Sequence, residues 1–541
     1  MKRVAWAAII SSGVATVDSV VPSTAYAADA PAMSAKALVA KPTQEPSDDF
    51  FARLIYYYKL EWGTTGPPPD PKAPPSRRDY FPPAPLSSPP MPFTEWPYGG
   101  TTSLGVTRPS SVDSPLMYAL APTDAGKWLN DHHIQIYGWV EAGANLSTNT
   151  VTPGGNAPAA YMYTPNTAQL DQAVMFIERL PDTVQKDHVD WGFRISSMYG
   201  VDYRYTTALG FFSDQLLRRN QVYGFDAPNL YGEVFFPQAA EGLMVRFGRF
   251  SALPDIESPF ATSNYMYSHS MLNTFDNYTN TGVQTTVATS KNLFLQLGLT
   301  DGTETMPWNV GARRSNPDPN PLYPGPTMPV DPGAQPSINA CARYQTDSAK
   351  DAIYLCVEGI NNGVWGYNNP QMYALTYYHK FNDEWHVAFE TYSIHQDHVA
   401  NINNSIAAAA IANGGTPFSP RYMPFNAPFP AQCDNQNALT CTASAFAAVA
   451  YLNYKFKPLD NITFRAEYYD DMEGQRTGVK TRYVEVGLGW QHWFSPQVEL
   501  RPEIAYYQAL DRPAFNGNFN ASIPPNRRDM LMAAADLIWH Y

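Results

Sequence analysis

From residue 132 to the end of the chain, the sequence repeats one pattern, in which apolar and polar side chains alternate over segments of about ten residues. Clear examples are GLMVRFG (242–248), NLFLQLGLT (292–300) and NITFRAEYY (461–469). Successive side chains of a β-strand point to opposite faces, so an alternation of period two indicates strands with one apolar and one polar face. The pattern therefore predicts an all-β fold for this part of the chain.

The environment of the apolar face follows from composition and from the connections between strands. Charged residues make up 16% of the chain, below the roughly 25% usual for soluble domains. No stretch approaches the ~18 consecutive apolar residues of a spanning helix, and without helices only a closed barrel satisfies its backbone in lipid. Short and long connections mostly alternate, as expected when one barrel end has tight turns and the other has extended loops. The short connections lie near 181–187, 237–241, 289–291, 381–384, 457–460 and 495–497, and the long ones near 148–167, 203–227, 252–277, 303–370, 399–444, 473–480 and 510–529.

These connections predict an antiparallel transmembrane β-barrel of about 14 strands over residues 132–541. The number becomes 16 if AIYLCVEGI (352–360) and a partner strand join the wall. Either number is even, which places both chain ends on the short-turn side, as in bacterial outer-membrane barrels. The closing strand ends on Tyr541, an aromatic residue at the rim, where aromatic side chains favour the lipid–water interface.

The N-terminal part of the chain differs from the barrel region. Residues 1–27 are typical of a signal peptide, with a positive start, a short apolar segment and the small-x-small sequence AYA. Residues 28–131 are predicted to form a Pro-rich, largely irregular periplasmic extension, with a short helix near 49–62. Thirteen prolines between 67 and 97 favour an extended spacer, and the alternative is a ligand for a proline-recognising partner.

Charge and cysteine content narrow the partners. The formal net charge of −13 argues against nucleic-acid binding. The four cysteines form two sequence-local couples, Cys341 with Cys356 and Cys433 with Cys441. In an exported protein this favours two disulfides that close short loops over free thiols. No CxxC pair and no histidine at ligand spacing accompanies them, so we expect neither a metal nor a cofactor.

The alternation also assigns side chains to a lumen face, because the lumen side of a membrane barrel is polar. Arginines of both halves of the barrel fall on this face, opposed by acidic residues. A wall with both signs would screen solutes by charge; the alternative is that these groups only solvate the interior and pair with one another. The predicted lumen residues are Arg194, Arg246, Arg465 and Arg501, with Glu141, Asp190, Glu390, Glu467, Glu485, Glu499 and Glu503.

Several stretches resemble the OmpL-like β-barrel porin family of Gram-negative bacteria, over roughly residues 134–541. The resemblance implies an outer-membrane porin that lets small hydrophilic solutes or ions diffuse through a water-filled barrel, in contact with outer-membrane lipid and lipopolysaccharide. It also implies that Tyr541 is read by the barrel-assembly machinery. The stretches are IYGWVEAGAN (136–145), the segment 170–217, GRFSALPDIES (248–258), NYMYSHSMLNTFDNYTNTG (264–282), YHKFNDEWH (378–386) and GQRTGVKTRYVEVGLGWQHW (474–493).

The long loop 252–277 is similar in rank to the third external loop of general porins, which folds into the lumen as a constriction. Its acidic residues Asp255 and Glu257 would then face the lumen arginines. The alternative is an outer lid, because loops generally stay on the surface.

An enzyme is not expected. YSHS (267–270) and HQDH (395–398) place histidines near serines or an aspartate, but GxSxG, HExxH and nucleotide-loop motifs are lacking. Two function classes remain. The first is a passive porin, and the second is a structural or adhesive barrel whose Pro-rich arm and external loops bind partners.

Overall fold

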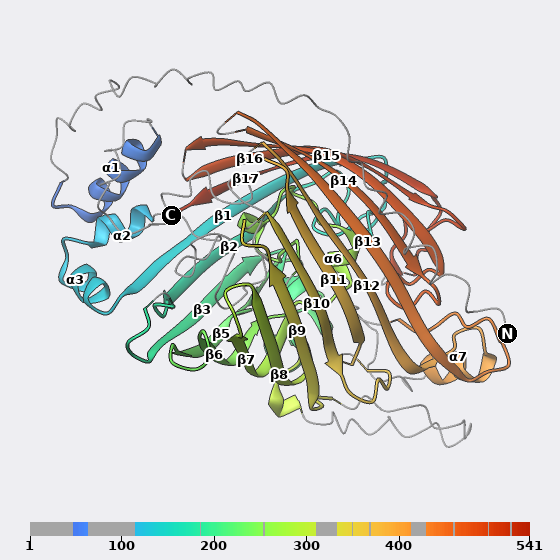
Figure 1. The fold of residues 1–541 in the computed structure, drawn as a ribbon. Coiled ribbons are helices and arrows are strands. Elements are labelled where there is room, and N and C mark those ends of the chain that lie inside the picture. Colours follow the sequence, from blue (N-terminus) through green and yellow to red (C-terminus); the bar gives the residue numbers. More distant parts are fainter. Residues whose placement is uncertain are drawn as a thin grey trace, which may run out of the picture. The chain divides into compact units, whose positions relative to one another are not determined.

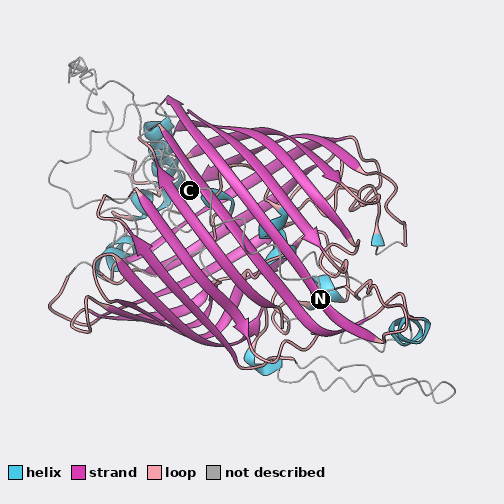
Figure 2. Cartoon of the chain, turned by 45° about the vertical axis from the view of Figure 1, so that its right-hand side comes forward, coloured by secondary structure: helices cyan, strands magenta, loops and turns pink. Residues whose placement is uncertain are grey.

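The wall of the protein is one sheet whose strands follow chain order, each antiparallel to its neighbours (Figures 1 and 2). β1 (Ile134–Ser147) pairs both with β2 (Ala168–Arg179) and with β17 (Asp529–His540), so the sheet is closed. The computed structural model describes residues 47–62, 114–183, 185–252, 255–309, 333–348, 350–366, 369–382, 384–412, 429–457, 460–495, 497–519 and 522–541.

The barrel wall has 16 strands. β3 (Asp190–Gly200) pairs with β4 (Gly224–Asp226) at its end and with β5 (Leu230–Phe236) over the rest of its length. β4 and β5 therefore act as one wall strand in two pieces. The remaining strands are β6 (Leu243–Ser251), β7 (Thr279–Ala288), β8 (Leu293–Thr303), β9 (Ser337–Gln345), β10 (Asp351–Ile360), β11 (Gln371–Lys380), β12 (Trp385–Ala400), β13 (Thr440–Lys457), β14 (Asp460–Asp471), β15 (Thr481–Ser495) and β16 (Val498–Ala509).

The predicted fold class, an antiparallel transmembrane barrel, is confirmed, and the strand number is the larger of the two considered. The count of 14 is wrong because it treats 303–370 as one long loop, and β9 and β10 lie inside this range. β9 reads SINACARYQ, with two alanines and an asparagine that are weak strand formers. It becomes a strand through its partners, since β8 and β10 pair with it on both sides.

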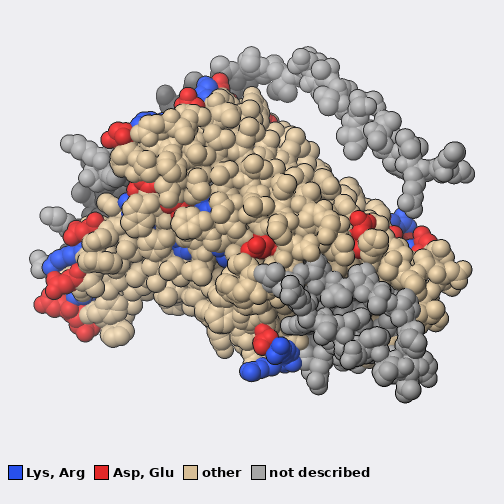
Figure 3. All heavy atoms as spheres, turned by 90° about the horizontal axis from the view of Figure 1, so that it is seen from below, with Lys and Arg blue, Asp and Glu red and all other residues tan. Residues whose placement is uncertain are grey.

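The two faces of the wall differ as the alternation predicts. In β8 the side chains of Leu295, Leu297 and Leu299 are 41%, 59% and 61% exposed, whereas Gln296 between them is 5% exposed. Apolar side chains therefore cover the outside and polar ones line the inside, which is the arrangement of a membrane barrel. Figure 3 shows a broad outer area of uncharged residues, with most charged atoms at its borders.

The two ends of the barrel also differ. No helix of the described residues is long and apolar enough to cross a membrane. Short helices occur in the connections: α4 (Tyr203–Thr206), α5 (Asp214–Leu217), α6 (Met271–Thr274), α7 (Ser405–Ala412), and the 3₁₀ turns at Ala261–Ser263 and Pro307–Asn309. One end has the short turns 180–189, 237–242, 289–292, 346–350, 381–384, 458–459 and 496–497, and the other has the connections 148–167, 201–229, 252–278, 304–336, 361–370, 401–439, 472–480 and 510–528.

The described residues before β1 contain three helices: α1 (Phe50–Trp62), α2 (Pro115–Leu120) and α3 (Asp124–Asp131). The Tyr58 hydroxyl of α1 donates to the His540 carbonyl at 3.0 Å, which places α1 beside the end of β17. α1 lies where the sequence predicts a short helix. α2 and α3 lie in the segment 28–131 that is predicted to be largely irregular, and both have capping residues: Ser114 accepts from the Met117 N–H and Thr123 from the Gly126 N–H.

The last residue also takes part in the closure. The backbone N–H of Tyr541 donates to the Gly138 carbonyl at 2.9 Å, and its hydroxyl donates to the Val174 carbonyl at 2.8 Å. A Cβ at Gly138 would lie 2.6 Å from the Tyr541 hydroxyl oxygen. The small residue at 138 therefore leaves room for the terminal aromatic ring across β1 and β2.

Charge on the outer face should impair folding more than charge on the inner face. Leu297→Arg is expected to cost roughly 2–4 kcal/mol, because Leu297 lies at the middle of β8 and faces lipid. Gln296→Glu puts a charge on the neighbouring lumen position without a change in size, and Leu297→Met is the neutral control. Folding into lipid vesicles under urea measures the difference, and equal losses at both positions would contradict the assignment of faces.

Candidate functional site: a loop folded into the barrel

The described part of the connection between β6 and β7, residues 252 and 255–278, lies inside the barrel, and we call it the inner loop. Its backbone reaches strands far round the sheet from β6 and β7. The N–H of Ile256 donates to Glu390 of β12 at 2.9 Å, and the N–H of Ser268 donates to Glu503 of β16 at 3.0 Å. Because these partners lie on the opposite wall, the inner loop crosses the lumen.

Carboxylates of the wall hold the backbone of the inner loop. Glu467 of β14 accepts the N–H groups of Met271 and Leu272 with its two oxygens, at 2.9 and 2.6 Å. These N–H groups open α6 and have no partner within the helix. Ser270 caps the same turn by accepting from the Asn273 N–H at 3.0 Å. Glu467 and Ser270 together therefore fix the start of α6 against β14.

Two arginines of the wall bind carbonyl groups of the inner loop. Arg465 donates to the Ser268 carbonyl at 2.8 Å, and Arg501 donates to the carbonyls of Ala261 and Asn264 at 2.7 and 3.1 Å. Each arginine also pairs with a wall carboxylate, Arg465 with Glu485 at 3.0 Å and Arg501 with Asp536. All four of these ion-pair groups are nearly inaccessible to solvent. The arginines that bind the inner loop are therefore each neutralised by a wall carboxylate.

The two acidic residues predicted for this loop have different surroundings. Glu257 accepts from the Tyr451 hydroxyl at 2.7 Å and from the Ser270 N–H at 2.9 Å, and lies 3.9 Å from the guanidinium of Arg465. Asp255 accepts from the Asn273 side chain and from the Glu257 N–H, each at 3.0 Å. Asp255 is therefore held in place by donors of the inner loop itself, whereas Glu257 also accepts from Tyr451 of wall strand β13.

The structure gathers part of the predicted lumen set around the inner loop: Glu257, Arg465, Glu467, Arg501 and Glu503. The other arginines lie elsewhere on the wall with their own acids. Arg194 donates to Glu178 at 2.7 Å, and Arg246 donates to Glu233 at 2.9 Å. The lumen charges had two interpretations, a wall with a field of both signs or charges that pair with one another. The structure shows that many of these charges are paired.

One lumen arginine does not follow the simple alternation. Arg249 lies on the apolar side of β6 by sequence parity, yet it is 1% exposed and forms a bidentate pair with Asp226 at 2.7 and 2.9 Å. Gly248 before it has a φ of +124°, a conformation that glycine adopts easily. The glycine is the sequence signal for this change of face.

Glycines of the wall make room for the inner loop. A Cβ at Gly143 of β1 would lie 2.2 Å from the Tyr267 hydroxyl oxygen, and one at Gly489 of β15 would lie 2.9 Å from a Met266 side-chain carbon. The Tyr267 hydroxyl donates to Asp171 of β2 at 3.0 Å. The loop thus contacts the wall on both sides of the closing seam between β1 and β17.

A group of three carboxylates beside the inner loop has the composition of a cation site. Oxygens of Asp255, Asp276 and Glu390 all lie within 4.8 Å of one another, and all three residues are buried. Oxygen ligands of this kind suit hard cations such as Ca²⁺ and Mg²⁺. The chemistry of the set is therefore compatible with a divalent ion or with shared protons.

The serines beside His269 have structural contacts in the inner loop. Ser268 accepts from Arg465 at 2.7 Å, Ser270 caps α6, and His269 contacts the Ser258 carbonyl at 2.8 Å. The His269 ring stacks on Tyr161 at 3.6 Å between ring centroids. These contacts account for the YSHS segment as part of the loop's packing.

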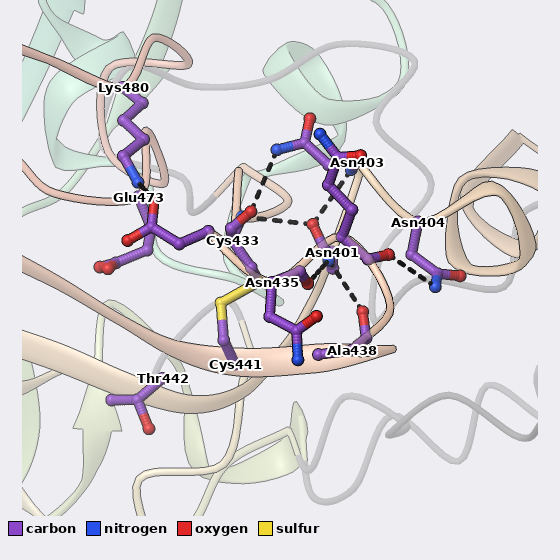
Figure 4. The surroundings of a disulfide bond; sticks show 12 residues. Asn401, Asn403, Asn404, Cys433, Asn435, Ala438, Cys441, Thr442, Glu473 and Lys480 are labelled. Atoms are coloured by element: carbon purple, nitrogen blue, oxygen red, sulfur yellow. Dashed lines mark hydrogen bonds and ion pairs between the residues drawn. A yellow bond between two sulfur atoms is a disulfide. The ribbon is translucent and has the colours of Figure 1, made fainter.

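The cysteines are joined in the two sequence-local couples. Cys341 and Cys356 face each other across β9 and β10, and Cys433 bonds to Cys441 at the start of β13. Figure 4 shows the second bond beside Asn401, whose side chain accepts from the Cys433 N–H at 3.2 Å and donates to the carbonyls of Asn435 and Ala438. The disulfide and Asn401 both shape the described part of the connection 401–439.

The family of the chain follows from its sequence and agrees with this geometry. A closed antiparallel barrel with an apolar outside, a polar lumen and an internal loop belongs to the class of outer-membrane porin-like barrels. The sequence model described as "Putative beta-barrel porin-2, OmpL-like" matches residues 133–538, and the chain belongs to this family. The predicted resemblance is thereby confirmed, and the protein is a bacterial outer-membrane protein. Among curated proteins, none matches the chain.

The chain is also similar to solved structures, at low sequence identity. The anion-selective porin from Comamonas acidovorans has 9% identity and a TM-score of 0.43, over 75% of this chain and 99% of that one. The channel DcaP of Acinetobacter baumannii has 9% identity and a TM-score of 0.42, over 75% and 97%. OmpT of Vibrio cholerae has 10% identity and a TM-score of 0.38, over 75% and 97%.

In the exported protein, all four cysteines should be oxidised as Cys341–Cys356 and Cys433–Cys441. Peptide mass mapping without reduction should find both cross-linked pairs. Reduction should require unfolding for Cys341–Cys356, because both residues are buried in the wall. Free thiols or crossed pairs in the mapped protein would reject the assignment.

Breaking the Arg465–Glu485 pair should destabilise the barrel more than removing both charges. Arg465→Met leaves Glu485 buried without its partner and is expected to cost about 3–5 kcal/mol. The double variant Arg465→Met with Glu485→Met should recover a large part of that loss, because Glu485 is no longer left buried without its partner. Urea unfolding from lipid vesicles gives both values, and a double variant as unstable as the single one would show that the pair itself is not the cause.

Proposed function

We propose that the chain is a porin through which small hydrophilic solutes or ions diffuse passively, and that the inner loop forms its constriction. The observation that carries the proposal is the anchoring of the inner loop across the lumen by Glu390, Glu467 and Glu503. A loop fixed in this way limits the size of a passing solute. The charged groups around it act at close range, where water is scarce and screening is weak.

In this proposal, the predicted pore-lining residues have separate roles. Glu257 and Arg465 lie side by side at the loop and set the local field, with Arg501 and Glu503 holding the loop. Arg194 and Arg246, each paired on the wall, contribute to a polar lumen surface. Asp255 faces Asp276 and Glu390, so it adds negative charge near the loop's start.

We also propose that residues 1–27 are a signal peptide and that 28–131 form a periplasmic extension. The contact of α1 with the end of β17 supports the second part, because this end carries the short turns. The Pro-rich segment lies outside the described residues. Tyr541, at the end of the closing strand, is the proposed point of recognition by the assembly machinery.

Conductance in planar bilayers tests the constriction. Asp255→Asn with Glu257→Gln should raise anion over cation permeability, because the substitutions remove acidic groups from the narrow part at constant size. A variant with the inner loop shortened should instead raise conductance. Asp214→Asn with Glu241→Gln makes the same change of charge on exposed residues outside the lumen and is the matched control.

Reversal potentials in a salt gradient, measured on variants that keep the heat-dependent mobility shift of a folded barrel, separate charge from size. Unchanged selectivity and conductance in both lumen variants would place the inner loop outside the conduction path. A wild-type protein without conductance would contradict the porin and favour the structural or adhesive barrel.

A further inference from the structure

Five connections meet in a pocket at the long-loop end of the barrel. Tyr163 comes from 148–167, Phe275 from the inner loop, Phe429 from 401–439, Arg476 from 472–480 and Phe519 from 510–528. The pocket includes about 580 Å³ of space between atoms, part of it open to solvent. As a cavity it measures about 60 Å³, less than pockets that enclose a whole drug-sized ligand, so a small ligand would lie partly in its open mouth.

The aromatic wall of the pocket is built from connections that bind one another. The Asn518 side chain donates to the Pro153 carbonyl at 2.7 Å, and the Phe429 N–H donates to the Gln475 carbonyl at 2.6 Å. The rings of Phe429 and Phe519 lie 5.4 Å apart between centroids. The apolar surface is therefore held in place before any ligand arrives, which lowers the entropy cost of binding.

Arg476 is the charged group of the pocket and differs from Arg465 and Arg501, the wall arginines that hold the inner loop. Its side chain is buried at 3% exposure and donates one hydrogen bond, to the Phe275 carbonyl at 2.6 Å. Its Nε has no hydrogen-bond partner. Asp471 accepts the backbone N–H of Arg476 at 3.0 Å, and no carboxylate of the described residues forms an ion pair with its guanidinium.

A buried guanidinium with an unused donor is costly unless an acceptor reaches it. Carboxylates are the natural partner, because their oxygens match the planar donors of arginine. The phenyl rings around Arg476 favour a flat apolar body attached to that carboxylate. Acceptors without such a body would leave the rings in contact with water.

We infer that this pocket binds small organic anions that join one carboxylate to a flat apolar group, and that it is a recognition site for solutes at the outer entrance. The inference deepens the proposed porin function and rests on it for its physiological meaning. The carboxylate lies against Arg476, and the apolar group lies among Tyr163, Phe429 and Phe519. Phe275 joins the pocket to the inner loop, so a bound anion sits directly next to the proposed constriction.

Benzoate is the probe, and calorimetric titration of the folded full-length protein in detergent is the measurement. Benzoate should bind at least roughly tenfold more tightly than acetate, which has the charge without the ring, and than benzyl alcohol, which has the ring without the charge. Arg476→Gln should weaken benzoate binding about tenfold or more, since a charge-assisted hydrogen bond is lost. Phe519→Ala, at a residue 42% exposed, should weaken benzoate binding and leave acetate unchanged.

The matched control is Arg218→Gln, which removes the same charge from an exposed arginine of 201–229 paired with Asp214; it should bind benzoate as the wild type does. Equal affinity for benzoate in the wild type and in folded Arg476→Gln, or no binding by the wild type, would overturn the inference. The titration does not depend on conduction. A protein that binds benzoate but does not conduct would support the anion-binding pocket and contradict the porin function. A protein that conducts but does not bind benzoate would support the porin function and contradict the anion-binding pocket.

Discussion

The backbone N–H groups of the inner loop must find acceptors, because the loop runs through the barrel without pairing as a strand. Carboxylates of the opposite wall supply them: Glu390, Glu467 and Glu503 each accept from the loop backbone. Acidic side chains suit this role, since an ionised carboxylate has two oxygens that only accept. The position of the loop, and with it the shape of the lumen, depends on these contacts.

So many buried acids require compensation, and arginines provide part of it. Arg465 and Arg501 each bind a wall carboxylate and carbonyls of the inner loop. A guanidinium has enough planar donors to serve both at once, which a lysine ammonium cannot do with the same geometry. The arginines therefore neutralise the wall and hold the loop, which explains why their pairing does not exclude a part in selectivity.

The sequence predicted the fold class because local alternation and lipid together leave one solution, as in β6, β8 and β14. It missed β9, whose strand character comes from pairing with β8 and β10 and not from its own residues. The rank and acidity of the inner loop were visible in the sequence. The contacts that anchor the loop could not be predicted from the sequence, because they join residues far apart in the chain. Glu467 and Met271 are 196 residues apart, and Glu503 and Ser268 are 235 residues apart.

The outer pocket and the inner loop share one hydrogen bond, from Arg476 to the Phe275 carbonyl. Arg476 uses one donor to hold the loop and has Nε without a partner, so an anion in the pocket and the loop carbonyl draw on the same guanidinium. Phe275 directly precedes Asp276, one of the three clustered carboxylates. Arg476 therefore contacts the residue that directly precedes Asp276, at an acidic part of the inner loop. In the two proposals, Arg476 attracts anions at the entrance and the carboxylates of the inner loop lie close by, so recognition and conduction depend on charges of opposite sign.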